Sequence, residues 1–421
     1  MHAFTLAFLA ALATATATRL WLAARHVRHV AANRVAVPAE FAGSITLAAH
    51  QKAADYTVVK TRLHMLEAVV GAGVLLAFTL GGGLQALFEL WAKVFSPGGF
   101  AHGIALILCV GAISGLIDLP FSLYRTFVIE ARFGFNRMTL GLFLADLAKQ
   151  LAIGLALGVP LLFCVLWLMS QMGALWWLYV WLTWIAFNLL MLVAYPTFIA
   201  PLFNRFSPLE DATMKERIER LLAKCGFRSK GLFVMDGSKR SSHGNAYFTG
   251  FGAAKRIVFF DTLLSRLAPP EVEAVLAHEL GHFKLRHVWK RVAWLFLASL
   301  GFLALLGWLA DQSWFYSSLG VQSRSTALAL VLFLMVVPVF TFLLQPLGSL
   351  YSRKHEYEAD AYAASHADAG DLVRALVKLY QDNAATLTPD PVHSAFYDSH
   401  PPASLRIARL QSAAGARPAA A

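Results

Sequence analysis

Seven long apolar stretches constrain the fold of this chain more than any other feature of its sequence. They lie near residues 4–24, 66–92, 100–124, 150–170, 174–200, 291–311 and 325–348. A helix needs about 20 largely apolar residues to cross the hydrocarbon layer of a membrane, and each stretch meets or approaches that length. With 58% hydrophobic and only 14% charged residues, the chain lies outside the usual composition of soluble domains. We therefore expect a mainly α-helical, polytopic membrane protein with seven spans.

Short motifs indicate how two of these spans begin or end. The fourth and fifth stretches are separated only by the segment 170–173, Ser-Gln-Met-Gly, which indicates a helical hairpin with a tight turn. No basic residue precedes the first stretch, whereas Arg25 and Arg28 follow it. A secretory signal peptide has the opposite arrangement, with positive charge in front of its apolar run. The first stretch is therefore predicted to be a retained membrane anchor.

The net charge of +11 is explained by membrane orientation and requires no nucleic-acid partner. Short loops rich in Lys and Arg stay in the cytoplasm. The segments after the first and third spans are the basic ones, and they hold Arg25, Arg28, Arg34, Lys52, Lys60, Arg62, Arg125, Arg132, Arg137 and Lys149. The opposing loops hold little more than Lys93 and Arg324. This asymmetry predicts an N-terminus outside and a C-terminus in the cytoplasm.

Two polar regions interrupt the membrane pattern, and both fall on the predicted cytoplasmic side. They divide the chain into four parts: a five-span region 1–202, a first catalytic part 203–290, a two-span hairpin 291–348 and a second catalytic part with the C-terminal tail, 349–421. We expect the two polar parts to form one α+β catalytic domain that the hairpin interrupts.

The first polar part contains signals for both strands and a helix. Segments 231–235 and 256–260 are short, rich in β-forming residues and flanked by turn residues, which predicts two strands of a small sheet. Pro269 and Pro270 then open a helix that is predicted to run through Lys290.

The sequence His278-Glu-Leu-Gly-His282 on this helix matches the HExxH motif. Histidines four residues apart lie on one face of a helix, where both imidazoles can bind one tetrahedral metal ion, most commonly zinc. Glu279 lies one position round from His278, within reach of a water at the metal, so its natural role is that of a general base. The motif predicts a hydrolase with one zinc ion per chain.

A catalytic zinc keeps three protein ligands, so the second polar part must supply one more. Glu356 and Asp360 lie four residues apart on a predicted helix after the seventh span. Glu356 is therefore the expected third ligand, and Asp360 is expected to accept a hydrogen bond from a ligand histidine. His355 is an alternative ligand, but it has no carboxylate four residues away.

A peptidase must also hold an extended peptide and stabilise an oxyanion. Residues 242–250 are predicted to form a short strand with turns at both ends, which can pair with a substrate as an added edge strand. We expect Asn245, Ala246 and Tyr247 on this strand to contact the substrate. An ordinary hairpin strand would have the same sequence pattern.

Near the C-terminus, His400 precedes two prolines and a basic helix that contains Arg406 and Arg409. A histidine on such a rigid turn suits oxyanion stabilisation. We expect His400 to act in catalysis and Arg406 to contact the substrate.

Several blocks of this chain resemble the integral-membrane gluzincin metallopeptidases typified by the type I CAAX prenyl endopeptidase. The blocks are residues 126–130 and 133–136 (Phe-Gly-Phe-Asn), 195–203, 245–248, the HELGH motif, Ser352-Arg353 leading to Glu356 and Asp360, and Ser399-His400-Pro401. The resemblance covers about residues 118–409, whereas the first hundred residues depend on the span pattern alone.

The resemblance implies seven spans around a large intramembrane chamber, with zinc facing the interior from the cytoplasmic end. It also implies removal of a C-terminal tripeptide from prenylated CAAX tails, and related peptide cleavage. The family's zinc ligands fall on His278, His282 and Glu356, its general base on Glu279 and its transition-state histidine on His400. Asn245 falls on the family's substrate-pairing strand.

Two departures from the family pattern are evident. Gly244 stands where the family tends to have serine, and the C-terminal sequence carries no endoplasmic-reticulum retrieval signal. Together with the alanine-rich composition, the second departure leads us to expect a bacterial inner membrane.

Two alternative functions share parts of this sequence pattern. A quality-control protease of the HtpX type would share the chemistry, but that group is shorter, has fewer spans and lacks the Phe-Gly-Phe-Asn block. A transporter or an inactive zinc-binding scaffold belongs to another class, and Asp118 within the third span is the kind of charge that would indicate transport.

Overall fold

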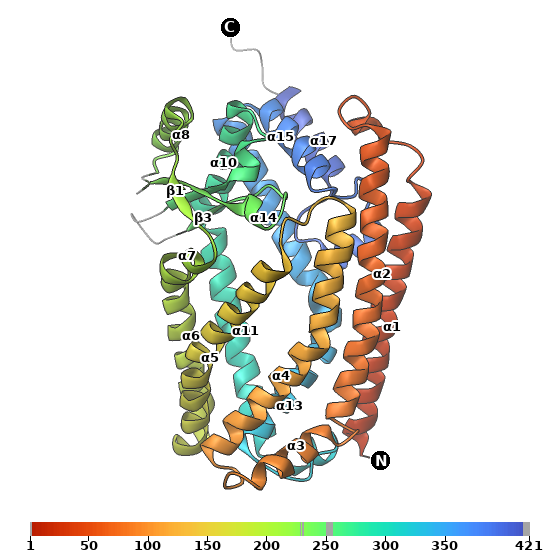
Figure 1. Cartoon of the computed structure of the whole chain (residues 1–421), viewed down its shortest axis with the longest axis vertical. Coiled ribbons are helices and arrows are strands. Elements are labelled where there is room, and N and C mark those ends of the chain that lie inside the picture. Colours follow the sequence, from red (N-terminus) through yellow and green to blue (C-terminus); the bar gives the residue numbers. More distant parts are fainter. Residues whose placement is uncertain (1, 228, 230, 250–255, 416–421) are drawn as a thin grey trace.

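The computed structural model describes residues 2–227, 229, 231–249 and 256–415. Long helices run parallel to the long axis of the molecule, and a small sheet with its surrounding helices lies at one end (Figure 1). The N-terminal helix begins at the opposite end. Both predicted catalytic parts therefore meet at one end of the helical region.

Seven helical segments in the described residues are long and apolar enough to cross a membrane, as predicted. They are Ala3–Ala32 (α1), Leu47–Phe78 (α2), Phe100–Glu130 (α4, Phe100–Tyr124, and a π-helical turn), Leu140–Gln171 (α5), Gly173–Phe203 (with α6, Trp176–Ala194, and α7, Ala200–Phe203), His287–Ala310 (α11) and Thr326–His366 (with α13, Thr326–Thr341, and α14, Gln345–His366). Met172 ends α5 at the predicted tight turn of the hairpin.

The remaining helices are short and lie at the two ends of these spans. They are Gly83–Ala92 (α3), Ala212–Lys224 (α8), Asp261–Leu264 (α9), Pro269–Lys284 (α10), Ser313–Ser317 (α12), Ala369–Asp382 (α15), Pro391–Tyr397 (α16) and Ala403–Gly415 (α17).

The second span differs from its predicted position, because α2 ends at Phe78 and residues 83–92 form the separate helix α3. Three consecutive glycines cause the break. Gly82 adopts a left-handed φ of 77°, and a Cβ on Gly81 or Gly83 would lie 2.8 Å from the carbonyl oxygen of Ala77. The polar residues before position 66 are helical as well, since this half of α2 packs along α1 (Figure 1). Hydropathy located the apolar residues but not the limits of the helix.

The sheet has the order β1-β2-β4-β3. Its strands are Phe206–Pro208 (β1), Leu232–Met235 (β2), Ala246–Thr249 (β3) and Arg256–Phe260 (β4). The strands β2 and β4 are parallel, whereas β1 and β3 pair antiparallel to their neighbours. The three predicted strands are confirmed. No sequence pattern predicted β1, which has three residues and ends in proline, a residue found mainly at sheet edges.

The core of the catalytic end lies between this sheet and the helices α8, α10 and α15. Ile257 and Phe259 of β4 are each 1% exposed and pack with Ile218 of α8 and Val272 of α10. Burial of each such side chain stabilises the fold by about 1.5–3 kcal/mol. This core fixes α10, and hence the HExxH motif, against the sheet.

The predicted helix through Lys290 is in fact two helices. The first, α10, ends at Lys284, and α11 begins at His287 as the sixth span. Arg286, between them, has a left-handed φ of 57°. Neither glycine nor proline marks this break in the sequence, because the change of direction from the catalytic domain into the membrane is imposed by tertiary packing.

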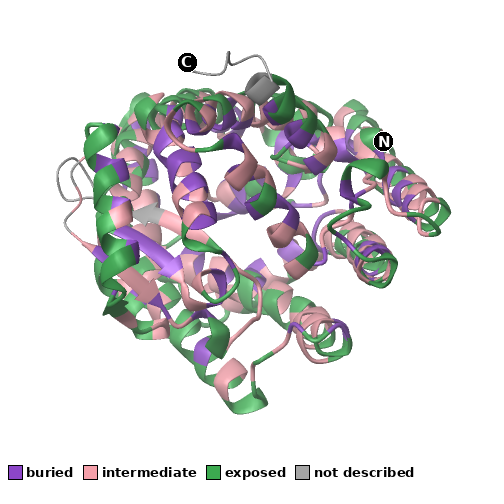
Figure 2. Ribbon diagram, turned by 90° about the horizontal axis from the view of Figure 1, so that it is seen from above, coloured by how far each residue is buried: buried purple, intermediate pink, exposed green. Residues whose placement is uncertain are grey.

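The last span differs from the others in its surroundings. Half of its most apolar window is buried within the protein, against 6–28% in the other six spans. The view along the long axis shows most membrane helices at the margin of the molecule (Figure 2). Helix α13 packs instead against α1, α4, α5 and α11, and α14 continues from it toward the sheet. The span with the largest buried share thus carries Glu356 to the HExxH helix.

Candidate metal centre

The HExxH helix α10 approaches α14 closely at Gly281. A Cβ at this position would lie 3.0 Å from Cβ of Tyr362 and 3.1 Å from Cα of Ala359. Only glycine allows this approach without displacing the backbone of α14. The fourth residue of the HExxH motif is therefore what brings the two helices together.

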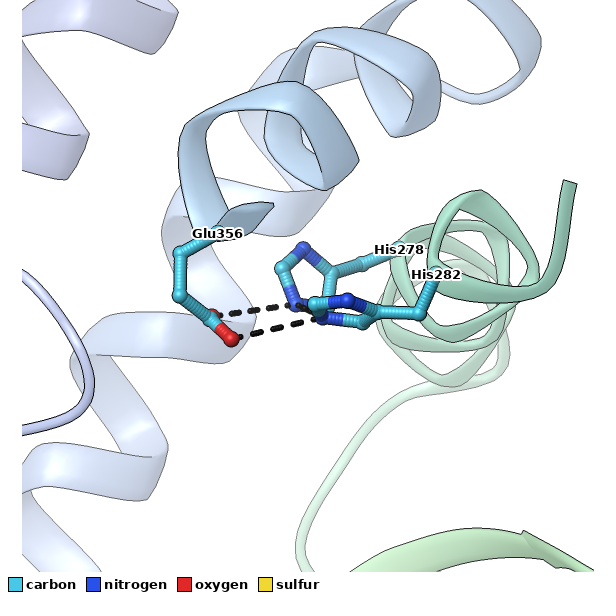
Figure 3. A group of neighbouring side chains, drawn as sticks. All are labelled: His278, His282 and Glu356. Carbon is cyan, nitrogen blue, oxygen red and sulfur yellow. Dashed lines mark hydrogen bonds and ion pairs between the residues drawn. The ribbon is translucent and has the colours of Figure 1, made fainter. Parts of the chain in front are cut away.

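Three predicted ligands meet between these helices (Figure 3). Nε2 of His278 lies 3.3 Å from Nε2 of His282 and 3.4 Å from Oε2 of Glu356. Nε2 of His282 lies 3.3 Å from Oε1 of Glu356. A tetrahedral ion with bonds of about 2.0–2.1 Å has ligand atoms about 3.3–3.4 Å apart. The three side chains therefore fit a tetrahedral metal ion.

The burial of the group supports the same interpretation. Glu356 is 3% exposed, and its Oε2 atom has no short hydrogen bond, because its nearest polar neighbours are Nε2 of His278 at 3.4 Å and Nη1 of Arg406 at 3.7 Å. A buried carboxylate oxygen that is bonded so weakly is costly. A metal ion held by this carboxylate and the two imidazoles would satisfy it.

In both motif histidines the Nδ1 atom, which points away from the other predicted ligands, contacts a further side chain, and the two partners differ in kind. Nδ1 of His278 lies 2.9 Å from Oδ1 of Asp360, which is the contact predicted from the sequence. Nδ1 of His282 lies 3.0 Å from Nδ1 of His287, whose Nε2 lies 2.9 Å from Oε2 of Glu358. A partner at the outer nitrogen fixes which ring nitrogen faces a metal.

The sequence analysis identified neither His287 as a partner of His282 nor Glu358 as a partner of His287. The signal for His287 was a third histidine five residues after His282, which looked like the continuation of one helix. The turn at Arg286 places it beside His282 instead.

His355, the alternative third ligand, points away from this group. Its ring stacks on that of His287 with 4.0 Å between ring centres and 9° between planes. The structure thus brings Glu356, and not His355, to the two motif histidines.

A cavity of about 190 Å³ is lined by His278, one of the three predicted ligands, and we call it the metal-site cavity. Its wall contains most of the other predicted site residues, namely Asn245, Ala246, Glu279, His400 and Arg406. Nε2 of His400 lies 3.4 Å from Oε1 of Glu356. The base, the histidine and the strand segment predicted for substrate therefore share one cavity with His278.

Burial and neighbouring charges shift the protonation of this site. Burial opposes a positive charge on His278, but hydrogen bonds to Asp360 and Glu356 outweigh it and raise its pKa to about 9. Burial also raises the pKa of Glu279 and lowers the pKa of His400. The carboxylates thus make the ligand group attract positive charge, while Glu279 is a stronger base than an ordinary glutamate.

Two predicted substrate contacts have other partners in the structure. Arg406 is 5% exposed and binds both carboxylate oxygens of Asp360, at 2.8 and 2.6 Å. The ring of Tyr247 packs edge-on against Phe260, and its hydroxyl lies 3.9 Å from Sδ of Met235. Their roles in substrate binding stay predictions.

The segment before β3 is held by the membrane region. Asn136 of the Phe-Gly-Phe-Asn block bridges to Ser241, and Arg240 binds the carboxylate of Asp146 on α5 at 2.8 and 3.0 Å. At Gly244, a Cβ would lie 3.5 Å or more from Leu263. A serine would therefore fit at this position without displacing the strand.

Comparison with known proteins agrees with this geometry. Residues 26–205 match the family model described as CAAX prenyl protease N-terminal, five membrane helices. Residues 208–414 match the model of peptidase family M48. The chain belongs to peptidase family M48. This M48 member is therefore an integral, multi-pass membrane metallopeptidase, which favours peptide hydrolysis over the transporter and inactive-scaffold alternatives.

Relatives match this M48 peptidase over most of its length. The CAAX prenyl protease 1 homolog of Oryza sativa subsp. japonica is 35% identical over 399 residues, which cover 92% of each chain. The CAAX prenyl protease 1 of Saccharomyces cerevisiae is 36% identical over 328 residues, or 74% of this chain and 72% of that one.

A solved structure has the same fold. The crystal structure of S. mikatae Ste24p matches with a TM-score of 0.90 and 30% identity, covering 97% of this chain and 99% of that one. The match over the whole length, including the N-terminal membrane region, favours the CAAX-type peptidases over the shorter HtpX type.

Proposed function

We propose that this peptidase is a zinc-dependent endopeptidase that cleaves peptides near a prenylated CAAX-type C-terminus. The proposal is carried by one observation: His278, His282 and Glu356 lie at the spacing of a tetrahedral metal site, and His278 lines a cavity whose wall also contains Glu279. Nitrogen and carboxylate ligands of this kind suit zinc. The prenylated substrate is inferred from the names of the relatives.

A bound zinc ion would polarise the scissile carbonyl group and make a water molecule more acidic. The chain's own residues supply the proton transfer. Glu279 has a raised pKa and lies next to the ligand His278, so it is placed to accept the proton of that water and to pass it to the departing amine.

His400 is placed to stabilise the oxyanion that forms during peptide hydrolysis. Oγ of Ser399 lies 3.0 Å from Nδ1 of His400. If the serine hydroxyl donates to Nδ1, the proton of the neutral ring is on Nε2, on the side of Glu356. From there it can donate a hydrogen bond to a developing negative charge.

The strand β3 offers a place for the peptide backbone. It is the last strand of the sheet order and pairs only with β4 within the described residues. Asn245 and Ala246 at its beginning line the metal-site cavity. A substrate that pairs with this free edge would therefore bring a peptide bond to Glu279.

The test compares cleavage of a prenylated CAAX peptide with that of the same peptide without its prenyl group, by purified protein loaded with zinc. We expect cleavage of the prenylated peptide and much slower cleavage of the other. Glu279→Gln should retain zinc and lose activity by about 10²–10⁴-fold or more. Undiminished cleavage by that variant would exclude Glu279 as the base.

The identity of the membrane is a separate part of the proposal. The alanine-rich composition leads us to propose a bacterial inner membrane, with the catalytic end in the cytoplasm. The relatives named above are all eukaryotic and give no support to a bacterial location. Fractionation of the native host, followed by protease treatment of inverted membrane vesicles, tests both statements.

A further inference from the structure

A second and larger cavity adjoins the metal-site cavity. Its volume is about 630 Å³, and its walls come mainly from α1, α2 and the segment 383–398. The side chain of Asn383 lines both cavities, and Asp398 in the wall of the larger one is two residues from His400 in the wall of the smaller one. A peptide bound at the metal centre can therefore extend into this large cavity.

Two cations in its wall form no ion pair within 4.0 Å among the described residues, although the carboxylate of Glu130, which accepts a hydrogen bond from Tyr56 and lies outside the wall, attracts Lys60 from a longer distance. The guanidinium carbon of Arg19 on α1 lies 4.4 Å from the centre of the Phe342 ring, and Nζ of Lys60 on α2 lies 4.6 Å from that of Tyr56. Neither forms an ion pair within 4.0 Å. Other arginines nearby do form ion pairs with carboxylates.

Other arginines in the same region are neutralised by carboxylates. Arg25 on α1 binds Asp390 at 2.8 Å, and Arg125 binds Glu67, which lies in the wall of the large cavity. Once Glu67 is paired, Asp398 is the one acidic side chain left among the residues that line this cavity. Two basic side chains, Arg19 and Lys60, line the same wall. The imidazole of His393 adds no charge at neutral pH, because burial lowers its pKa to about 4.

Unpaired cations in membrane-spanning helices require an explanation. Such residues are rare, face the interior or a water-filled cavity, and mark the paths of substrates and ions. Arg19 and Lys60 both lie within spanning segments, and both line a cavity that continues to a peptidase centre. The ligand that they favour is an anion.

We propose that Arg19 and Lys60 bind the C-terminal carboxylate of the peptide that is cleaved at the metal centre. This inference depends on the proposed function, because it takes the substrate to be cut near its C-terminus. A three-residue leaving group spans about 10 Å when extended, which suits a path from one cavity into the next. The site would then measure the distance from the cleaved bond to the end of the chain.

The test measures equilibrium binding, so that it does not require activity. A fluorophore-labelled, S-prenylated tetrapeptide is titrated into the full-length Glu279→Gln protein, once with a free C-terminal carboxylate and once with a C-terminal amide. We expect the carboxylate form to bind about tenfold more tightly or better, as for a charge-assisted contact.

Two substitutions and one control then locate the effect. Arg19→Met and Lys60→Met should each reduce the preference for the carboxylate form, and together they should abolish it without weakening the amide form. Lys52→Met is the matched control, because Lys52 also lies on α2 with its Nζ 4.7 Å from an aromatic ring centre, that of Phe135, but does not line the large cavity. It should leave the preference unchanged.

Equal binding of the two peptides, or a preference that survives in the Arg19→Met, Lys60→Met double variant, would overturn the inference. A lipid phosphate shares the anionic chemistry, so binding is repeated in nanodiscs of phosphatidylcholine and of phosphatidylglycerol. A preference seen in phosphatidylcholine and lost in the double variant supports the carboxylate even if phosphatidylglycerol competes with it, whereas no preference in either lipid would assign the cations to another anion and overturn the inference. The proposed function fails separately, if the wild-type protein cleaves neither peptide.

Discussion

Two groups of two histidines and one glutamate lie side by side in this protein, and their geometry differs. In the group His278, His282 and Glu356, the rings are nearly perpendicular at 83°, and three ligand atoms converge at 3.3–3.4 Å. In the group His287, His355 and Glu358, the two rings are stacked within 9° of parallel.

This difference decides which group can hold a metal ion. The lone pair of an imidazole nitrogen lies in the plane of its ring, so two stacked rings direct their lone pairs along parallel planes and cannot share one ion. The second group instead joins the first through the contact between His287 and His282. Composition and proximity alone do not identify a metal site, because ring orientation is also required.

The largest expected effect comes from the glutamate of the first group. Glu356→Ala should lower the metal content from about one ion per chain to near zero after dialysis, because it removes one of three ligands. The matched variant Glu358→Ala, in the second group, should retain its metal. Metal analysis of both purified proteins measures this. Full occupancy in Glu356→Ala would place the third ligand elsewhere.

A smaller effect is expected where the two groups touch. His287→Ala removes the partner of Nδ1 of His282 and should weaken zinc binding about 10–100-fold. Competition with a fluorescent chelator measures the affinity. His287→Gln, which can still accept a hydrogen bond, should recover part of it. If His287→Ala bound zinc as tightly as the wild type, the second group would have no role in supporting the first.

The approach of α10 to α14 can be tested without touching a ligand. Gly281→Ala forces a methyl group against Ala359 and should lower the stability by about 1–3 kcal/mol, with a parallel loss of zinc affinity. Gly301→Ala on α11 is the control, because a Cβ there meets nothing within 4 Å. Thermal unfolding with and without zinc compares the two. Equal melting temperatures would show that the close approach is not required.

The smallest effect is expected at His355. Its Nδ1 atom is buried without a hydrogen-bond partner, and such a group is costly by about 1–3 kcal/mol. His355→Phe keeps an aromatic ring against His287 and removes that atom, so stability should stay equal or rise slightly and zinc affinity should not change. A marked loss of zinc in this variant would make the second group part of the metal site.

Local sequence patterns were sufficient to predict many structural features of this protein. The number of spans follows from apolar length, and three strands follow from short β-rich runs between turn residues. The pair His278 and His282 follows from the geometry of a helix, because residues four apart share one face. Each of these features depends on neighbours in the sequence, so that no knowledge of the fold was required.

Features that depend on contacts between segments far apart in the sequence could not be predicted from local patterns. The break at Arg286, the position of α2 and the pairing of Arg406 with Asp360 each depend on what packs against them. The sequence pattern favoured Glu356 over the adjacent His355, but which of the two meets the motif histidines depends on which face of α14 packs against α10.

By itself, the sequence determined that this is a seven-span membrane protein with a zinc-binding motif, because hydrophobic length and helical periodicity are local properties. Only the tertiary structure showed that Glu356, and not His355, faces the two motif histidines, that His287 contacts His282, and that Arg19 and Lys60 line a cavity beside the site. These outcomes depend on the direction in which side chains from separate helices point, and that direction is set by packing between segments far apart in the chain.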